Sequence, residues 1–226
     1  MQLEEVLALL EEEANPEYKE KITRFAINPK ESYGIRLPVL RKIAKTIGTN
    51  HELALELWNY GNHDTKILAT LIDDYTLVTP KQFDKWTYSF TTWDECDQAC
   101  LNLLCKVDCV DEKIRQYSQA DEEFVKRCAF SLIAVLAVHE KQAADDYFID
   151  FFPLIIKASD DDRNFVKKAV NWAIRQIGKR NINLNREAIE LSYRIMETNT
   201  KSGKWISKNA IKELESSKVR EKLLKE

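Results

Sequence analysis

The sequence predicts an all-α protein, a curved α-α superhelix in which helical repeats stack one on the next. Only 5 Gly and 5 Pro occur among 226 residues, fewer turn residues than a β-sandwich or barrel requires. Apolar residues recur at spacings of three and four, and no segment shows a two-residue alternation of useful length. A related segment also returns about every 40 residues in the second half of the chain, which is typical of repeat proteins.

The predicted helices are marked by apolar spacing and by capping residues. Apolar residues repeat at three and four over residues 3–10 and predict the first helix. Gly48 is a typical C-terminal glycine, and Thr49 with Glu52 has the spacing of a capping box. The predicted helices cover residues 3–14, 16–28, 39–47, 50–58, 64–75, 80–90, 94–106, 111–118, 122–138, 142–157, 163–179, 185–197 and 202–216.

An internal repeat organises the second half of the chain. Residues 118–127 and 159–168 both carry an acidic turn that leads into Phe-Val-Lys and a second base, and the two copies are 41 residues apart. A looser copy begins at Trp205, 40 residues later. A period near 40 with paired helices is typical of HEAT-like solenoids. We therefore expect a single HEAT-like repeat domain over residues 1–226, with the repeats clearest from about residue 118 onward.

The composition is that of an ordinary soluble protein. Hydrophobic residues make up 44% of the chain and charged residues 31%, and no run of about 18 apolar residues occurs. Residues 1–5 are acidic and lack the layout of a signal peptide. These observations predict a cytoplasmic protein without membrane contact, and we expect a monomer.

Basic residues gather in the C-terminal third. Residues 163–226 contain 16 Lys and Arg against 7 Glu and no Asp, a net charge of +9, whereas the remainder has a net charge of −12. The repeat register predicts that Arg127, Lys168 and Lys208 form a ladder on the concave surface. This asymmetry is expected of a protein that binds a polyanion through one surface. Solvated helix faces would give the same composition.

No metal or cofactor site is predicted. The five cysteines are Cys96, Cys100, Cys105, Cys109 and Cys128, and three or four residues separate successive members of the first four. Zinc ribbons use closer Cys-x2-Cys pairs, so we interpret these cysteines as core residues, although a metal cluster is the alternative. The histidines His51, His63 and His139 are scattered, and a Gly-rich phosphate loop is absent.

Residues 92–98, Thr-Trp-Asp-Glu-Cys-Asp-Gln, form the first candidate site. If a helix begins at Asp94, Trp93 and Asp97 lie four residues apart on nearly the same face. An aromatic plane beside a carboxylate can bind a sugar and stabilise positive charge on it. The alternative is a core tryptophan and an aspartate that serves the helix start, where the macrodipole favours acids.

Trp172 and Arg175 form a second candidate group with Lys168, on the predicted helix over residues 163–179. Apolar residues of that helix nearly fill its buried face, so Trp172 is predicted to face the groove, although a wide core face is the alternative. A groove with two tryptophans, one carboxylate and a ladder of bases suits a phosphate backbone and deoxyribose.

The sequence resembles the AlkD-like DNA alkylation repair glycosylases, a HEAT-repeat family. The resemblance spans nearly the whole chain, from Tyr-Gly-Ile-Arg-Leu-Pro at residues 33–38 through Trp-Asp-x-x-Asp at 93–97 to Phe-Val-Lys-Lys-Ala-x-x-Trp at 165–172. It implies a concave DNA-binding groove in which Trp93, Asp97, Arg127 and Trp172 line the catalytic cleft. The net charge of −3 departs from the basic character usual in proteins that bind duplex DNA.

The implied activity is hydrolysis of the N-glycosidic bond of cationic N3- and N7-alkylpurines in double-stranded DNA. Asp97 would stabilise the oxocarbenium-like sugar and position a water molecule, while Arg127 and Lys168 would hold phosphates. Such a reaction needs no cofactor. The alternative is a non-catalytic HEAT-repeat scaffold that binds damaged or branched DNA or a protein partner.

Overall fold

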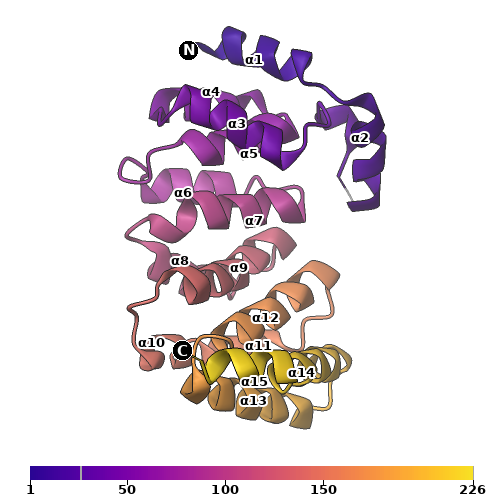
Figure 1. Cartoon of the computed structure of the whole chain (residues 1–226), viewed down its shortest axis with the longest axis vertical. Helices are drawn as coiled ribbons and strands as arrows, with labels where there is room; N and C mark the ends of the chain where they lie inside the picture. Colours follow the sequence, from indigo (N-terminus) through magenta and orange to yellow (C-terminus); the bar gives the residue numbers. More distant parts are fainter. Residues whose placement is uncertain (26, 226) are drawn as a thin grey trace. The chain divides into compact units, whose positions relative to one another are not determined.

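The computed structural model describes residues 1–25 and 27–225, and this part of the chain contains helices and no strand (Figure 1). The predicted all-α class is confirmed. None of the described helices is long and apolar enough to cross a membrane. The chain divides into two compact units, Met1–Val107 and Asp108–Glu226. The single domain expected from the sequence stays a prediction.

The first unit is organised around α5. Its elements are α1 (Leu3–Glu12), α2 (Pro16–Lys21), η1 (Ile22–Phe25), η2 (Pro29–Glu31), α3 (Leu37–Ile47), α4 (His51–Tyr60), α5 (His63–Ile72), α6 (Pro80–Thr87), α7 (Trp93–Asn102) and η3 (Leu104–Lys106). Helix α5 packs against α3, α4 and α7, and nearly all of its residues are buried. Because it has helices on several sides, α5 keeps charged groups such as Asp64 and Lys66 in the interior.

Asp64 joins the first turn of α5 to the loop that precedes α3. Its carboxylate accepts hydrogen bonds from Ser32 Oγ at 2.6 Å, from the Tyr33 backbone N–H at 2.7 Å and from the Ile35 backbone N–H at 3.2 Å. Gly34 in the same loop has a φ of 75°. A Cβ at this position would meet the Asn15 carbonyl oxygen at 2.6 Å, so the loop requires glycine here.

The second unit is organised around α9 and α12, which form its most extensive helix pair. Its elements are α8 (Val110–Tyr117), α9 (Glu123–His139), α10 (Asp145–Ile149), α11 (Phe152–Ala158), α12 (Asn164–Ile177), α13 (Ile182–Glu197), α14 (Lys201–Leu214) and α15 (Ser217–Leu223). The repeat found in the sequence is visible here, because the equivalent rings of Phe124 and Phe165 contact each other with centroids 5.4 Å apart. Helix α14 in turn packs against α12 and α13.

The largest differences between the predicted and the observed helices occur at three places. The helix expected over residues 142–157 is divided into α10 and α11. Pro153 lies in the first turn of α11, where proline is tolerated. In one continuous helix over residues 142–157 it would lack a donor, and its ring would clash with the carbonyl four residues earlier. The helix expected over residues 16–28 is shorter and continues as the 3-10 turn η1, and the one expected over residues 94–106 ends at Asn102. Helix α15 is an addition to the predicted set.

Candidate functional site

The first candidate group lies at the start of α7. Thr92 is the N-cap residue, and its hydroxyl accepts a hydrogen bond from the Glu95 backbone N–H at 3.4 Å. The helix therefore begins at Trp93, one residue earlier than expected. Asp97 lies in the second turn and does not cap the helix. Both Trp93 and Asp97 are half-buried, and their spacing of four puts them on nearly the same face of α7.

A buried ion pair fixes α7 against α5. Lys66 Nζ lies 3.3 Å from Glu95 Oε1, and the exposed fractions of the two residues are only 8% and 3%. The Glu95 carboxylate also accepts a hydrogen bond from the Thr91 backbone N–H at 2.9 Å. Removing either partner of such a pair would leave an uncompensated buried charge. The pair therefore determines the position of α7 and of the Trp93 and Asp97 side chains that it carries.

A second pair joins the same helices. His63 Nε2 donates to Asp94 Oδ2 at 2.8 Å, and Asp94 Oδ1 accepts from Thr92 Oγ1 at 2.8 Å. Burial acts to lower the pKa of His63, but the hydrogen bond and charge of Asp94 outweigh it, so the pKa of His63 is raised. Burial acts to raise the pKa of Asp94, yet the hydrogen bond and charge of His63 hold it below its usual range.

These shifts predict a pH-dependent stability. A raised pKa means that the contribution of His63 is present below its ordinary pKa of 6.5 and is lost as the pH rises through the raised value. The contribution of Asp94 is present above its ordinary pKa of 3.8 and is lost as the pH falls. His63→Gln should therefore lower the free energy of unfolding more at about pH 6 than at about pH 9 in urea titrations. An equal loss at both pH values would contradict this account.

Arg127 is buried in the second unit. Its Nη1 donates to the Phe165 carbonyl oxygen at 2.7 Å, and the residue is 5% exposed. The guanidinium thus joins α9 to the start of α12, whereas the equivalent Lys168 and Lys208 are exposed. Arg127 is therefore buried in the contact between repeats, unlike the other two members of the expected ladder. The ladder itself stays a prediction. A role of Arg127 in binding phosphate stays a prediction.

The remaining predicted residues lie on α12 and α14. Lys168 and Trp172 are four residues apart on α12, and the indole is half-buried, so Trp172 is not part of the fully buried core. Arg175 follows on the same face and forms an ion pair with Glu213 of α14. Lys208 is exposed on α14.

Trp205 was not among the predicted site residues. It is 37% exposed, and Lys167 Nζ lies 5.4 Å from the centroid of its ring. The sequence signal for Trp205 is its position in the repeat, where it is equivalent to Phe165.

The predicted residues are thus divided between the two units. Trp93 and Asp97 belong to the first, and the second contains Arg127, Lys168, Trp172, Arg175 and Lys208. The catalytic cleft that combines both groups stays a prediction. Among the cysteines, four are buried and Cys109 is half-buried, as expected of small apolar core residues.

Comparison with known proteins identifies the family and the fold. A family model described as DNA alkylation repair enzyme matches residues 6–214. The uncharacterized protein Lin0241 of Listeria innocua is 33% identical over 79 residues, which cover 34% of this chain and 35% of the relative. The uncharacterized protein Lmo0209 of Listeria monocytogenes is 25% identical over 103 residues, which cover 44% and 46%. The matched stretches therefore span about a third of Lin0241 and just under half of Lmo0209.

One solved structure is similar to this chain over most of the length of both proteins. The protein in that structure is described as belonging to a new family of proteins related to the HEAT-like repeat DNA glycosylases with affinity for branched DNA structures. The TM-score is 0.76 at 20% identity, and the match covers 85% of this chain and 83% of the other. This likeness confirms the HEAT-like repeat fold expected from the 40-residue period. Because the family model extends over almost the whole chain, the protein belongs to the family of DNA alkylation repair enzymes.

Proposed function

We propose that this protein is a monofunctional DNA glycosylase that releases cationic N3- and N7-alkylpurines from double-stranded DNA, with Asp97 as the catalytic residue. The observation that carries the proposal is the pair of half-buried side chains, Trp93 and Asp97, on one face of α7 in a chain of the DNA alkylation repair family. Thr92, rather than Asp97, is the N-cap residue of this helix.

The chemistry of the substrate explains why one carboxylate suffices. A purine alkylated at N3 or N7 carries a positive charge, so it leaves as a neutral base and needs no general acid. As the bond between C1′ and the purine nitrogen breaks, its electron pair passes to the purine and positive charge develops on the sugar. The Asp97 carboxylate stabilises this charge and orients the water that bonds to C1′. The water then gives up a proton to the solvent, and the products are a neutral free purine and an abasic sugar.

The other residues bind the substrate in this proposal. The Trp93 and Trp172 rings contact the deoxyribose and the cationic nucleotide through their faces, which favours a positively charged base. Lys168 and Lys208 are exposed and bind phosphates as point charges. Arg175 shares Glu213 with Lys179, and Arg127 supports the groove through its bond to Phe165.

The direct test is release of methylated bases from DNA. The intact protein is incubated with a duplex containing N7-methylguanine or N3-methyladenine, and the freed purine is quantified by chromatography. Release is expected from both substrates. A matched duplex containing O6-methylguanine, which is neutral, should give none because its departure would require a general acid. If a protein that unfolds cooperatively released neither cationic purine, the glycosylase proposal would be rejected.

A second candidate function is binding of branched DNA without cleavage. It is favoured by the described affinity of the structurally similar protein family for branched DNA and by the net charge of −12 outside residues 163–226, which disfavours extended contact with duplex DNA. In this case the protein would bind a four-way junction more tightly than a duplex of equal length and release no base. Competition between these two DNAs, measured beside the release assay, distinguishes the two functions.

A further inference from the structure

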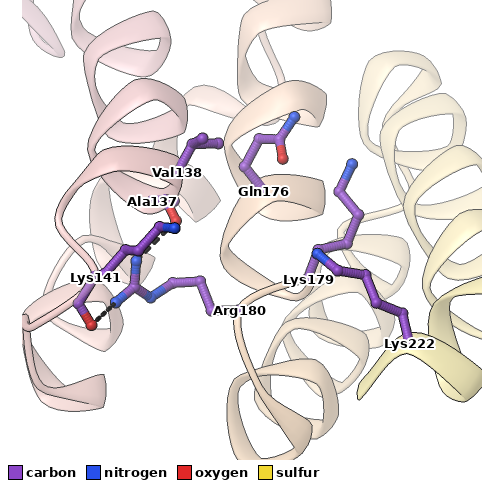
Figure 2. A pocket seen from close by; sticks show the side chains of 7 residues that line it. All are labelled: Ala137, Val138, Lys141, Gln176, Lys179, Arg180 and Lys222. Carbon is purple, nitrogen blue, oxygen red and sulfur yellow. Dashed lines mark hydrogen bonds between the residues drawn. The ribbon is translucent and has the colours of Figure 1, made fainter. Parts of the chain in front are cut away.

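A basic pocket of about 550 Å³ lies in the second unit, where α9 and α12 end (Figure 2). Its charged lining residues are all basic, and they come from three segments of the chain. Lys141 follows α9, Lys179 and Arg180 follow α12, and Lys222 reaches toward the end of α12 from α15 (Figure 2). Gln176, in the last turn of α12, adds an amide to the lining. None of these residues is among the predicted site residues.

Arg180 forms one wall and neutralises the end of α9. Its Nη1 donates to the Ala137 carbonyl oxygen at 2.7 Å, and its Nη2 donates to the Glu140 carbonyl oxygen at 2.8 Å. The guanidinium carbon also lies 4.2 Å from the centroid of the Phe148 ring. The carbonyl groups at the end of a helix carry partial negative charge and repel anions. Because the Arg180 guanidinium covers these carbonyl groups, a cation masks the negative end of α9 on this wall of the pocket.

The three lysines give the pocket an excess of positive charge. Lys179 pairs with Glu213 at 2.8 Å, but the same carboxylate is shared with Arg175, so one negative charge faces two positive ones. Lys141 and Lys222 are exposed side chains whose ammonium groups can turn toward a bound ligand. Four cationic groups lining a concave surface, with donors from lysines and one amide, suit a compact anion of high charge density such as phosphate.

The pocket continues the exposed face of α12. Lys168, Trp172, Gln176 and Lys179 follow one another at spacings of four, four and three, so they lie along one face of the helix and its C-terminal turn. The distance along the axis from Lys168 to Lys179 is about 16 Å at 1.5 Å per residue. A DNA strand places a negative charge every ~3.4 Å of helix axis, so this length corresponds to several nucleotides.

We propose that the pocket formed by Lys141, Lys179, Arg180 and Lys222 binds a backbone phosphate of a DNA strand that passes along α12. The inference rests on the proposed function only in that DNA is the partner, and it does not depend on the chemistry at Asp97. Arg180 is held in place by the α9 carbonyl groups, and the lysines close on the phosphate from the other sides. The pocket thereby fixes the strand at a point several nucleotides from the Lys168 contact.

The test measures how DNA binding depends on salt. An undamaged fluorescent duplex is titrated with the intact protein, Lys141→Gln and Lys222→Gln at several salt concentrations, and log K is plotted against log salt concentration. Each substitution should lower the affinity several-fold, and each lost phosphate contact makes the slope shallower by about 0.9. Arg180 is left unchanged, because its bonds to α9 make it part of the folded structure.

A matched control and a second ligand separate the possible outcomes. Lys45→Gln removes the same charge from an exposed position on α3 and should leave the slope unchanged. Slopes that are unchanged in both pocket variants would overturn the proposal.

Inorganic phosphate is titrated alone by calorimetry as a second ligand. Saturable phosphate binding that is lost in Lys222→Gln, while the slope for DNA is unchanged, would assign the pocket to a free anion instead. Base release is assayed separately, so a protein with the expected slopes but no release would contradict the glycosylase alone.

Discussion

Asp97→Asn is expected to reduce release of N3- and N7-methylpurines by about two orders of magnitude or more, while the protein still folds and binds DNA. Asparagine has nearly the same size and shape as aspartate, so the change removes the charge and little else. Without the carboxylate, the positive charge that develops on the sugar loses its electrostatic stabilisation, and the attacking water loses its acceptor. The rate is measured under single-turnover conditions with excess protein, so that weaker or tighter DNA binding does not enter the result.

A control for charge is needed, because removal of any carboxylate also makes the protein less acidic. Glu56→Gln removes one negative charge from an exposed position on α4, in the same unit as Asp97. It should leave the single-turnover rate unchanged. If both variants lost activity equally, or if Asp97→Asn retained the full rate, Asp97 would not be the catalytic residue.

Much of the secondary structure could be predicted from the sequence, because helix ends depend on local interactions. Gly48 ends α3 as expected. The capping box expected at Thr49 is wrong, because the N-cap residue of α4 is Asn50, whose side chain accepts from the Leu53 backbone N–H. The break between α10 and α11 was missed although its cause, Pro153, is also local. Helix α15 was missed because it is short; its signal was Ser216 as the N-cap residue.

The interior of the candidate site could not be predicted in the same way. The partners of Asp94 and Glu95 are His63 and Lys66, which are 31 and 29 residues away along the chain. Helical periodicity relates residues three and four apart, so it contains no information about pairs about 30 residues apart. The repeat makes Arg127 equivalent to Lys168 in the sequence. It does not indicate that the Arg127 side chain turns toward the Phe165 carbonyl, because that contact also joins residues far apart in the chain.

One arrangement recurs once these long-range pairs are known. Acidic residues near the starts of buried helices bond to the repeat that precedes or follows them. Asp64 at the start of α5 binds the loop at residues 32–35, and Asp94 at the start of α7 binds His63. Glu123 at the start of α9 accepts a hydrogen bond from the Phe165 backbone N–H at 3.2 Å. In an array whose repeats contact only their neighbours, these bonds determine how each repeat is placed on the next.

The strongest of these bonds should be at Asp64, and Asp64→Ala is expected to lower the free energy of unfolding by about 3 to 5 kcal/mol. The residue is 1% exposed. Its carboxylate accepts hydrogen bonds from one hydroxyl and two backbone N–H groups. Alanine would leave these donors without their acceptor at a position that is almost completely buried. A buried donor without a partner costs about 1 to 3 kcal/mol, and bonds to a charged group are stronger than neutral ones. The loss is measured by urea unfolding at neutral pH.

Asp74 provides the matched control, because it makes similar bonds at the surface. Its carboxylate accepts from the Thr76 backbone N–H at 3.0 Å and from the Thr76 hydroxyl at 2.7 Å. The residue is half-buried, but both bonds lie at the protein surface. In Asp74→Ala, water replaces the lost acceptor, so the free energy of unfolding should change little. The expected result is a large loss of unfolding free energy in Asp64→Ala and a small loss in Asp74→Ala. This result would show that the stability of the contact between repeats depends on burial of the unpaired donors rather than on the number of hydrogen bonds. Similar losses in the two variants would contradict that explanation.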